Sequence, residues 1–296
     1  MKLSQVLRER TRPFYSLEFF PPKDPEQFPA FIKTASRLKE LDPLFASVTY
    51  GAGGGSQQNT IEVARRLKGE CGFEPMTHLT CVGATHERID SYLRELESIG
   101  VSNILALRGD APKPQSPDAP PFDWSSGPFR FASDLVEYVC KKFPDFGVSV
   151  AGYPAPHPES VTFEDDRVFT GRKLEAGADF VVTQLFFDVR EYIDLTARLR
   201  AIGCDKPVIP GVLPIQSFES LRHVLSLCGA NIPAKLYIAL EDANKSGGAE
   251  AVREAGLKFA VEQIRRLIDA GAPGIHLYTL NKADTCLRIA EAVGEL

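Results

Sequence analysis

Short apolar runs alternate with longer amphipathic segments along the whole chain. The first run, residues 14–22, is rich in aromatic and small side chains and ends in two prolines, which is typical of a buried strand. In the segment that follows it, residues 24–41, apolar side chains recur at helical spacing. The alternation continues to the end of the chain and predicts eight strands, at residues 14–22, 45–50, 75–82, 103–107, 147–153, 180–187, 207–213 and 274–280.

Helices are predicted between these strands and after the last one, at residues 24–41, 57–67, 86–99, 131–143, 163–176, 189–202, 217–227, 249–270 and 282–293. Helical connections between apolar strands require a parallel sheet that is covered by helices. Eight such units in 296 residues are the count of an α/β protein of the (β/α)8 TIM barrel type. We therefore predict one barrel domain over residues 1–296, with a Pro-rich loop at 111–130 and an insertion at 231–248 before the last unit. A doubly wound sheet is the alternative.

Composition and charge mainly exclude classes of function, such as binding to nucleic acid or to a membrane. The net charge of -5 gives no reason to expect nucleic acid or an anionic membrane as a partner. No apolar run approaches the roughly 20 residues of a membrane span, and the charged N-terminus lacks the apolar core of a signal peptide. The six cysteines are scattered without a CxxC pair, so we expect no metal site and reduced thiols in a cytoplasmic protein.

Polar side chains stand at or near the C-terminal ends of six predicted strands. They are Glu18, Thr49, His78, Asp110, Tyr153 and Gln184. Barrel enzymes build their active sites at this end, from several strands at once. The pattern predicts a shared site there, although strands often end in polar residues simply because loops begin at that point.

Glu18 is the one charged residue inside the first apolar run. Burial disfavours the ionised form of a carboxyl group, so we expect a raised pKa for Glu18. A carboxyl group that stays protonated near neutral pH can act as a general acid. The alternative is a structural carboxylate that is paired with a buried arginine or with backbone amides.

Three further segments suggest contacts with a ligand, and each of them could instead have a purely structural role. The Gly-rich residues 51–55 allow close approach of the backbone to a flat or phosphorylated ligand, or form an ordinary turn. Arg108 is suited to a phosphate and Asp110 to ligand N–H groups, unless the two pair with each other. The adjacent bases Arg172 and Lys173 could bind a diphosphate or lie on a solvated helix face.

The chain carries, in this order, the segments SLEFFPP, SVTYGAGGG, THLTC, LALRGD, AGYPAPHPES, TQLFFD, PGVLP and LYTLN. In these segments the chain resembles the methylenetetrahydrofolate reductase family. The likeness spans essentially all 296 residues, and LEFFPP, LRGD and TQLFFD are together its most specific part.

The resemblance implies a barrel that binds FAD at its C-terminal strand ends. NADH or NADPH would reduce the flavin, and 5,10-methylenetetrahydrofolate would then take the same face and leave as 5-methyltetrahydrofolate. Glu18 matches the general acid that protonates folate N10, and Asp110 matches a carboxylate near the flavin that favours the cationic iminium. Gln184 matches an amide that contacts nicotinamide and pterin in turn, and Phe218 an aromatic side chain that packs on either ligand.

The resemblance also implies the residues that hold the flavin. They are Thr49, Tyr50, Ala52, His78, Arg108, Gly109, Asp110, Ala132, Tyr153, His157, Asp166, Arg172 and Lys173. Three features depart from the family pattern. Phe169 replaces a frequent Asn, Lys282 replaces a frequent Arg and so offers the folate a point charge, and the Pro-rich segment 111–130 is longer than expected.

Two other functions remain open from the sequence. One is a flavin-independent barrel reductase, and the other is a folate- or flavin-binding subunit of a larger complex. The choice between NADH and NADPH is also open. We expect a homo-oligomer, because the helical outer faces of barrels can pair, and no S-adenosylmethionine-sensing domain after Leu296.

Overall fold

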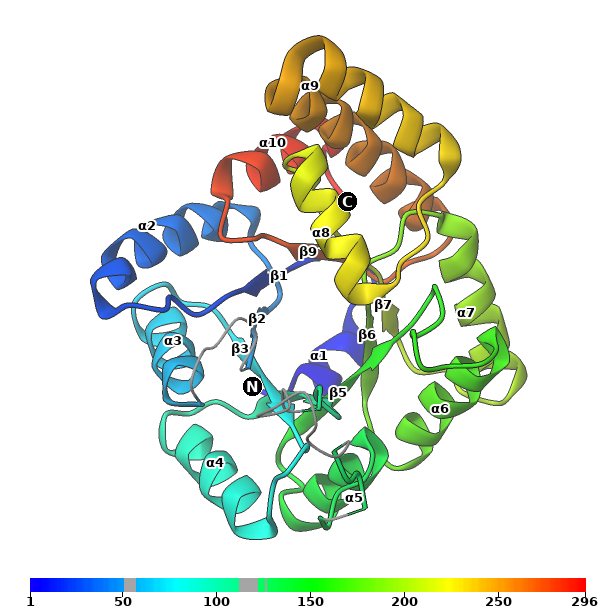
Figure 1. The fold of residues 1–296 in the computed structure, drawn as a ribbon. Helices are drawn as coiled ribbons and strands as arrows, with labels where there is room; N and C mark the ends of the chain where they lie inside the picture. Colours follow the sequence, from blue (N-terminus) through cyan, green and yellow to red (C-terminus); the bar gives the residue numbers. More distant parts are fainter. Residues whose placement is uncertain (51–56, 112–121, 126) are drawn as a thin grey trace.

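The protein is a ring of parallel strands surrounded by helices (Figure 1). This computed structural model describes residues 1–50, 57–111, 122–125 and 127–296. The strands are β1 (Tyr15–Phe19), β2 (Ala46–Val48), β3 (Pro75–Thr80), β4 (Asn103–Leu107), β5 (Gly147–Gly152), β6 (Phe180–Thr183), β7 (Val208–Ile209), β8 (Gly211–Val212) and β9 (Ile275–Tyr278). The predicted single (β/α)8 barrel is confirmed.

The ring closes around Pro210. The strand order is β7-β6-β5-β4-β3-β2-β1-β9-β8, with every pairing parallel. Because β7 pairs with β6 and β8 pairs with β9, the two short strands are halves of one barrel strand. Pro210 has no N–H for the ladder, but its carbonyl accepts a hydrogen bond from the His276 N–H at 2.9 Å. The nine strand segments therefore form eight barrel staves.

The helices cover the outside of this ring and are α1 (Leu3–Glu9), α2 (Phe28–Leu38), α3 (Gln57–Gly69), α4 (His86–Ser98), α5 (Ala132–Lys142), α6 (Phe163–Glu175), α7 (Val189–Ala201), α8 (Phe218–Cys228), α9 (Ala234–Asp269) and α10 (Ala283–Val293). Side chains that accept backbone N–H groups fix several of their starts, such as Thr85 before α4, Thr162 before α6 and Ser217 before α8.

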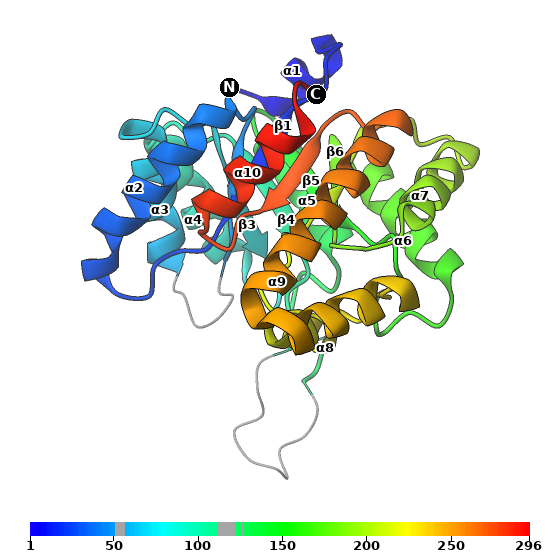
Figure 2. The same ribbon diagram turned by 90° about the horizontal axis from the view of Figure 1, so that it is seen from above.

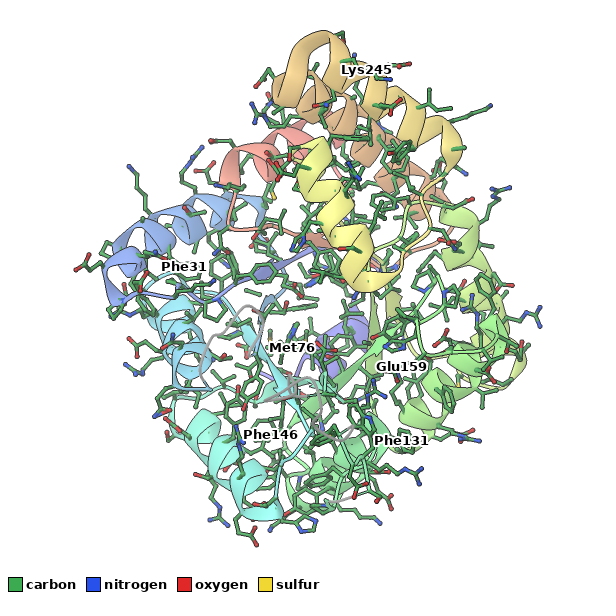
Figure 3. All side chains as sticks on the ribbon, in the orientation of Figure 1. Phe31, Met76, Phe131, Phe146, Glu159 and Lys245 are labelled. Carbon is green, nitrogen blue, oxygen red and sulfur yellow. The ribbon has the colours of Figure 1, made fainter. Side chains whose placement is uncertain are left out.

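The core has an inner and an outer part. All five residues of β1 are buried, as expected for a parallel strand with side chains packed on both faces. The inner part fills the end of the barrel that is nearer to α1. There Met76 lies near the centre of the ring (Figure 3) and accepts a hydrogen bond from Ser149 at 3.0 Å. Leu3 and Leu7 of α1 belong to this inner cluster. The short helix α1, which the sequence analysis did not predict, therefore closes the N-terminal end of the barrel (Figure 2).

The segment predicted as an insertion, residues 231–248, contributes the first half of the long helix α9. The helix bends sharply where Gly247 (φ -149°) and Gly248 (φ 60°, ψ -150°) leave helical geometry. The first half of α9 lies beside α8, at the end of the barrel opposite α1 (Figure 2). None of the helices in the described ranges is long and apolar enough to cross a membrane.

Candidate active site

A cavity of about 590 Å³ lies at the C-terminal ends of the strands. Its wall combines side chains from many staves, as expected for the functional end of a barrel. Residues that the sequence analysis named and that line this cavity are Glu18, Thr49, Tyr50, His78, Arg108, Gly109, Asp110, Tyr153, His157 and Gln184. The register of the parallel sheet thus gathers residues that are far apart in the sequence.

A second cavity, of about 350 Å³, adjoins the first and shares Arg108, Tyr153 and His157 with it. It runs toward α5 and α6, and its wall includes the predicted residues Ala132, Asp166, Arg172 and Lys173 as well as Phe169. The two cavities therefore adjoin at these shared residues.

Two predicted residues that the structure describes, Phe218 and Lys282, are not brought into these walls. Phe218 lies half-buried at the start of α8, where its ring packs on Tyr237 at 5.2 Å. Lys282 is an exposed side chain directly before α10. Ala52, with the Gly-rich segment, lies outside the described residues.

Glu18 sits near the end of β1 with only 7% of its surface exposed. Its Oε2 atom lies 3.3 Å from His78 Nε2 and 3.7 Å from His276 Nε2. Ser47 also donates a hydrogen bond to Oε2, at 3.5 Å. Glu18 therefore has two imidazole neighbours, neither of which the sequence analysis connected to it.

These neighbours correct the expected protonation of Glu18. Burial does raise its pKa, but the interactions with His276 and His78 outweigh burial and lower the pKa of Glu18 to about 2. The prediction of a raised pKa is therefore wrong for this arrangement. The carboxylate is ionised near neutral pH, and a proton that it passes on has to reach it from a neighbour.

Two buried hydroxyl groups in the cavity walls lack a hydrogen-bond partner among the described residues. They are the Oγ1 atoms of Thr49 in the first cavity and of Thr170 in the second. A buried polar group without a partner is uncommon in native proteins and usually has a reason, such as a ligand or water. Both oxygen atoms are covered by the protein, so they are unsatisfied polar groups behind the cavity walls.

Arg108 does not pair with Asp110. Its guanidinium donates two hydrogen bonds to the Glu159 carboxylate, at 2.7 and 2.8 Å. The same guanidinium lies 4.2 Å from the ring centre of Trp124, a cation–π contact. Arg108 is held where the two cavities meet, and a phosphate there would compete with Glu159. The sequence analysis included Glu159 in its loop but gave it no role.

Asp166 organises the loop that carries His157. Its carboxylate accepts hydrogen bonds from the His157 backbone N–H and the Ser160 hydroxyl, both at 2.9 Å. His157 Nδ1 accepts the backbone N–H of Glu159 at 3.1 Å. In a neutral imidazole the proton is then on Nε2, which makes His157 a hydrogen-bond donor in the shared wall.

Lys173, a cation in the wall of the second cavity, has a lowered pKa. Its Nζ donates to the Ala151 carbonyl at 2.5 Å. Burial lowers the pKa of Lys173 to about 8, and the nearby charge of Asp166 offsets only part of this. The neighbouring Arg172 is exposed and lies over the ring of Phe169.

Tyr278 is a wall residue that the sequence analysis quoted in LYTLN without giving it a role. Its hydroxyl donates to the Thr183 carbonyl at 2.6 Å, which joins β9 to β6 across the closure. Gly211 leaves room for this ring, because a Cβ atom there would lie 2.6 Å from both Tyr278 and the Thr183 carbonyl oxygen. The strand closure and the cavity wall thus depend on the same contact.

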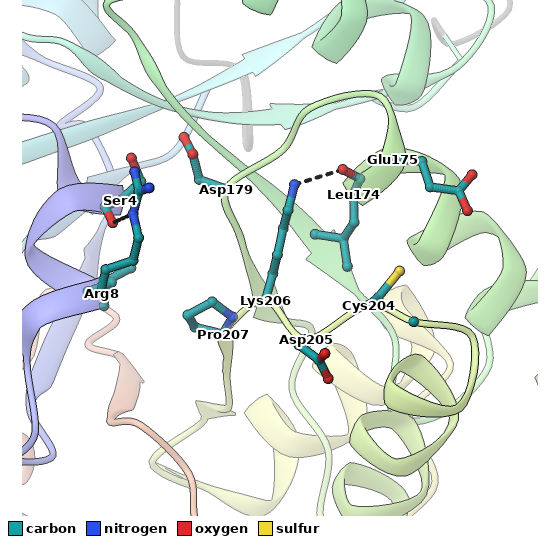
Figure 4. A pocket seen from close by; sticks show the side chains of 11 residues that line it. Ser4, Arg8, Leu174, Glu175, Asp179, Cys204, Asp205, Lys206 and Pro207 are labelled. Atoms are coloured by element: carbon teal, nitrogen blue, oxygen red, sulfur yellow. Dashed lines mark hydrogen bonds between the residues drawn. The ribbon is translucent and has the colours of Figure 1, made fainter.

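A third cavity, of about 760 Å³, lies at the other end of the barrel, between α1 and the loops that precede the strands (Figure 4). Lys206 in its wall donates to the carbonyls of Leu174 and Ala178, at 2.9 and 2.5 Å. None of the predicted site residues lines it. Residues at the N-terminal face of a barrel usually serve stability, so we assign the active site to the opposite end.

Side chains that could bind a metal do not cluster in the described ranges. No group of three His, Cys, Asp or Glu residues with suitable spacing occurs there. The six cysteines are free thiols.

Comparison with known proteins identifies the family. A family model described as methylenetetrahydrofolate reductase matches residues 2–294. The 5,10-methylenetetrahydrofolate reductase of Escherichia coli (strain K12) is 34% identical over 282 residues, which cover 94% of this chain and 90% of that protein. Methylenetetrahydrofolate reductase (NADH) 1 of Arabidopsis thaliana is 35% identical over 97% of this chain. The chain spans only 49% of that protein, about half its length.

A solved structure from Clostridium thermocellum has the same fold, with a TM-score of 0.68 and 16% identity over 98% of this chain and 97% of that one. It is described as an uncharacterized protein that binds two copies of 5-methyl-5,6,7,8-tetrahydrofolic acid. At this identity the likeness shows the fold alone. The family-model match over nearly the whole chain and the 34% identity to the Escherichia coli protein show that this chain belongs to the methylenetetrahydrofolate reductase family.

Proposed function

We propose that this protein reduces 5,10-methylenetetrahydrofolate to 5-methyltetrahydrofolate with FAD as its cofactor and NADH or NADPH as reductant, in two successive half-reactions. The observation that carries the proposal is the position of Glu18, a buried carboxylate in the wall of the first of two adjoining cavities, in a chain of this family. Reductive opening of the folate ring requires an acidic group at such a point.

The residues of the two cavities fit FAD. The two adjoining cavities, with Arg108, Arg172 and Lys173 in their walls, suit a long polar ligand that carries a diphosphate. We propose that the first cavity holds the flavin ring and the second, with Arg172 and Lys173, the diphosphate side. A flavin held there would supply hydride transfer between the reduced nicotinamide and the folate.

The chain's own side chains handle the proton and the charge. Glu18 would pass a proton to N10 of the folate, so that the five-membered ring can open. Asp110 would favour the cationic iminium through its negative charge. Gln184 has its Oε1 occupied by the Leu185 backbone N–H at 2.9 Å, which leaves its NH₂ group to donate to the pterin or the nicotinamide. We propose that Phe218 and Lys282 contact the parts of the folate that extend beyond the cavity.

Rapid mixing with absorbance detection tests the proposed function. The holoenzyme is reduced by NADH or NADPH and then mixed with methylenetetrahydrofolate. We expect flavin bleaching in the first step and recovery of colour in the second. A protein that never binds FAD but still oxidises NAD(P)H with the folate would be the flavin-independent reductase. A protein that binds FAD and is never reduced would be the binding subunit.

The affinity for FAD is expected to weaken above pH 8. A phosphate near Lys173 favours its ammonium form, so binding raises a pKa that is about 8 in the free protein. Below pH 8 Lys173 is already charged in the free protein. Above pH 8 Lys173 has to gain a proton when FAD binds, which lowers the affinity by up to about tenfold per pH unit. Quenching of Trp124, the only tryptophan, measures the affinity at each pH.

Two variants sharpen this test. Lys173→Met should bind FAD more weakly at pH 7 and lose the pH dependence. Arg172→Met should keep the pH dependence, because Lys173 is intact. An unchanged dependence in Lys173→Met would assign the effect to another group.

Asp110→Asn is expected to make the bound flavin easier to reduce and the folate half-reaction slower. The change keeps the shape of an exposed side chain in the first cavity but removes its negative charge. A nearby anion opposes electron uptake and stabilises a cationic intermediate, so both effects are lost together. A redox titration that gives an unchanged or lower flavin potential would contradict this role.

We also propose a cytoplasmic homo-oligomer. Apolar side chains are exposed at the start of α6 and on α7, including Val161 (92% exposed), Phe163 and Ile193. Light scattering after size-exclusion chromatography gives the assembly state, and a monomer at micromolar concentration would contradict the proposal.

A further inference from the structure

We propose that His276 is a positioning residue which, through Ser47, holds the proton that Glu18 passes to the folate. This inference rests on the proposed function. Because Glu18 is ionised, a neighbouring group has to hold the proton before the transfer.

The first argument is geometric. His276 lies on β9 with 0% of its surface exposed, beneath the floor of the first cavity. The register sets Ser47 of β2 opposite Glu18 of β1, and His276 opposite Ser16. Ser47 Oγ lies 3.3 Å from His276 Nε2 and 3.5 Å from Glu18 Oε2. The hydroxyl therefore bridges the imidazole and the carboxylate, which are 3.7 Å apart.

The second argument is that the imidazole can be charged or neutral without losing a partner. When it is charged, Nδ1–H donates to Ser16 Oγ at 2.8 Å, and the Ser16 hydroxyl can turn to the Ile275 carbonyl at 3.5 Å. When Nε2 has given up its proton, Nδ1–H still donates to Ser16 Oγ, and the bare Nε2 accepts from the Ser47 hydroxyl, 3.3 Å away. A buried group that changes charge needs such partners, because an unpaired polar atom in the interior is costly.

The ring has a fixed orientation. Phe45 stacks on it with ring centres 5.7 Å apart, and Tyr278 meets it edge-on at 5.5 Å. Nε2 therefore points to Ser47 and Glu18.

The transfer conserves charge and atoms. The Nε2–H bond of His276 breaks as its proton moves to Ser47 Oγ. The original O–H bond of Ser47 breaks as the hydroxyl proton moves to Glu18. The O–H bond of Glu18 then breaks as N10–H forms. His276 ends neutral, Ser47 and Glu18 are unchanged, and the folate nitrogen holds the proton.

Other titratable groups around the cluster are few. His78 of β3 reaches the same Glu18 oxygen, at 3.3 Å, and lines the cavity directly. Tyr278 has a pKa well above its ordinary value because of burial, so it stays neutral. The imidazoles that face the Glu18 carboxylate are thus those of His78 and His276.

His276→Gln tests the inference in the holoenzyme. FAD binding and the nicotinamide half-reaction should match wild type, because neither needs this proton. In the folate half-reaction, the pH above which the rate falls should move down by about one unit, as expected when one of several strongly interacting sites is lost. Above that pH the rate should be about tenfold lower than wild type. His86→Gln, on the exposed start of α4, is the matched control and should leave the profile unchanged.

Ser47→Ala supplies a second test that does not depend on the stability of His276→Gln. It keeps the imidazole and removes the bridge, so the profile should shift in the same direction. An unchanged pH profile in either folded variant would overturn the inference. Failure of the proposed function looks different, since wild-type protein would then fail to reduce methylenetetrahydrofolate at any pH.

Discussion

Glu18→Gln is expected to slow the folate half-reaction by roughly 10²–10⁴-fold, the usual contribution of a positioned acid. The amide keeps the volume of the carboxyl group but cannot relay a proton. Hydride transfer from nicotinamide needs no acid at this point, so that half-reaction should stay within a small factor of wild type. Flavin absorbance reports the two half-reactions separately.

Glu191→Gln on α7 is the matched control for this variant. Glu191 is a half-buried carboxylate that accepts a hydrogen bond from Asn231, away from both cavities. It should leave both half-reactions unchanged. If both half-reactions fall together in Glu18→Gln, Glu18 is a structural carboxylate for the barrel or the flavin. If neither falls, the proton donor is another group.

Gly211→Ala is expected to destabilise the fold by about 1–3 kcal/mol, the usual cost of overpacking, and to lower the Tm by several degrees. The new Cβ atom would lie 2.6 Å from the Thr183 carbonyl oxygen, which is backbone and cannot swing away. It would also press on Tyr278, whose ring lines the first cavity. We therefore expect weaker substrate binding together with the lower Tm.

Gly69→Ala at the end of α3 is the control for the added methyl group. Nothing lies within 4 Å of a Cβ atom there, and alanine favours a helix over glycine. Its Tm should be equal to or slightly above that of wild type. A Gly211→Ala protein with a wild-type Tm would show that β8 can shift without cost.

Helices and strands were largely predictable because their signals are local. Apolar runs bounded by loops gave every barrel strand, although the seventh is divided at Pro210 and the sixth, β6, ends at Thr183 rather than at residue 187. The helix α1 was not predicted, because its seven residues are too few to show a clear period and its apolar partners lie inside the barrel. The family likeness added the site residues, most of which line the two cavities.

The sequence by itself determined the eight strand-and-helix units, the polar residues at the strand ends and the family. These depend on periodicity and on motifs within a few residues. The tertiary structure decided the ionisation of Glu18, the partner of Arg108 and the position of Phe218 away from the cavities. A pKa depends on charges a few ångströms away, and for Glu18 those charges come from His78 and His276. Only the register of a closed barrel brings residues so far apart in sequence to one carboxylate.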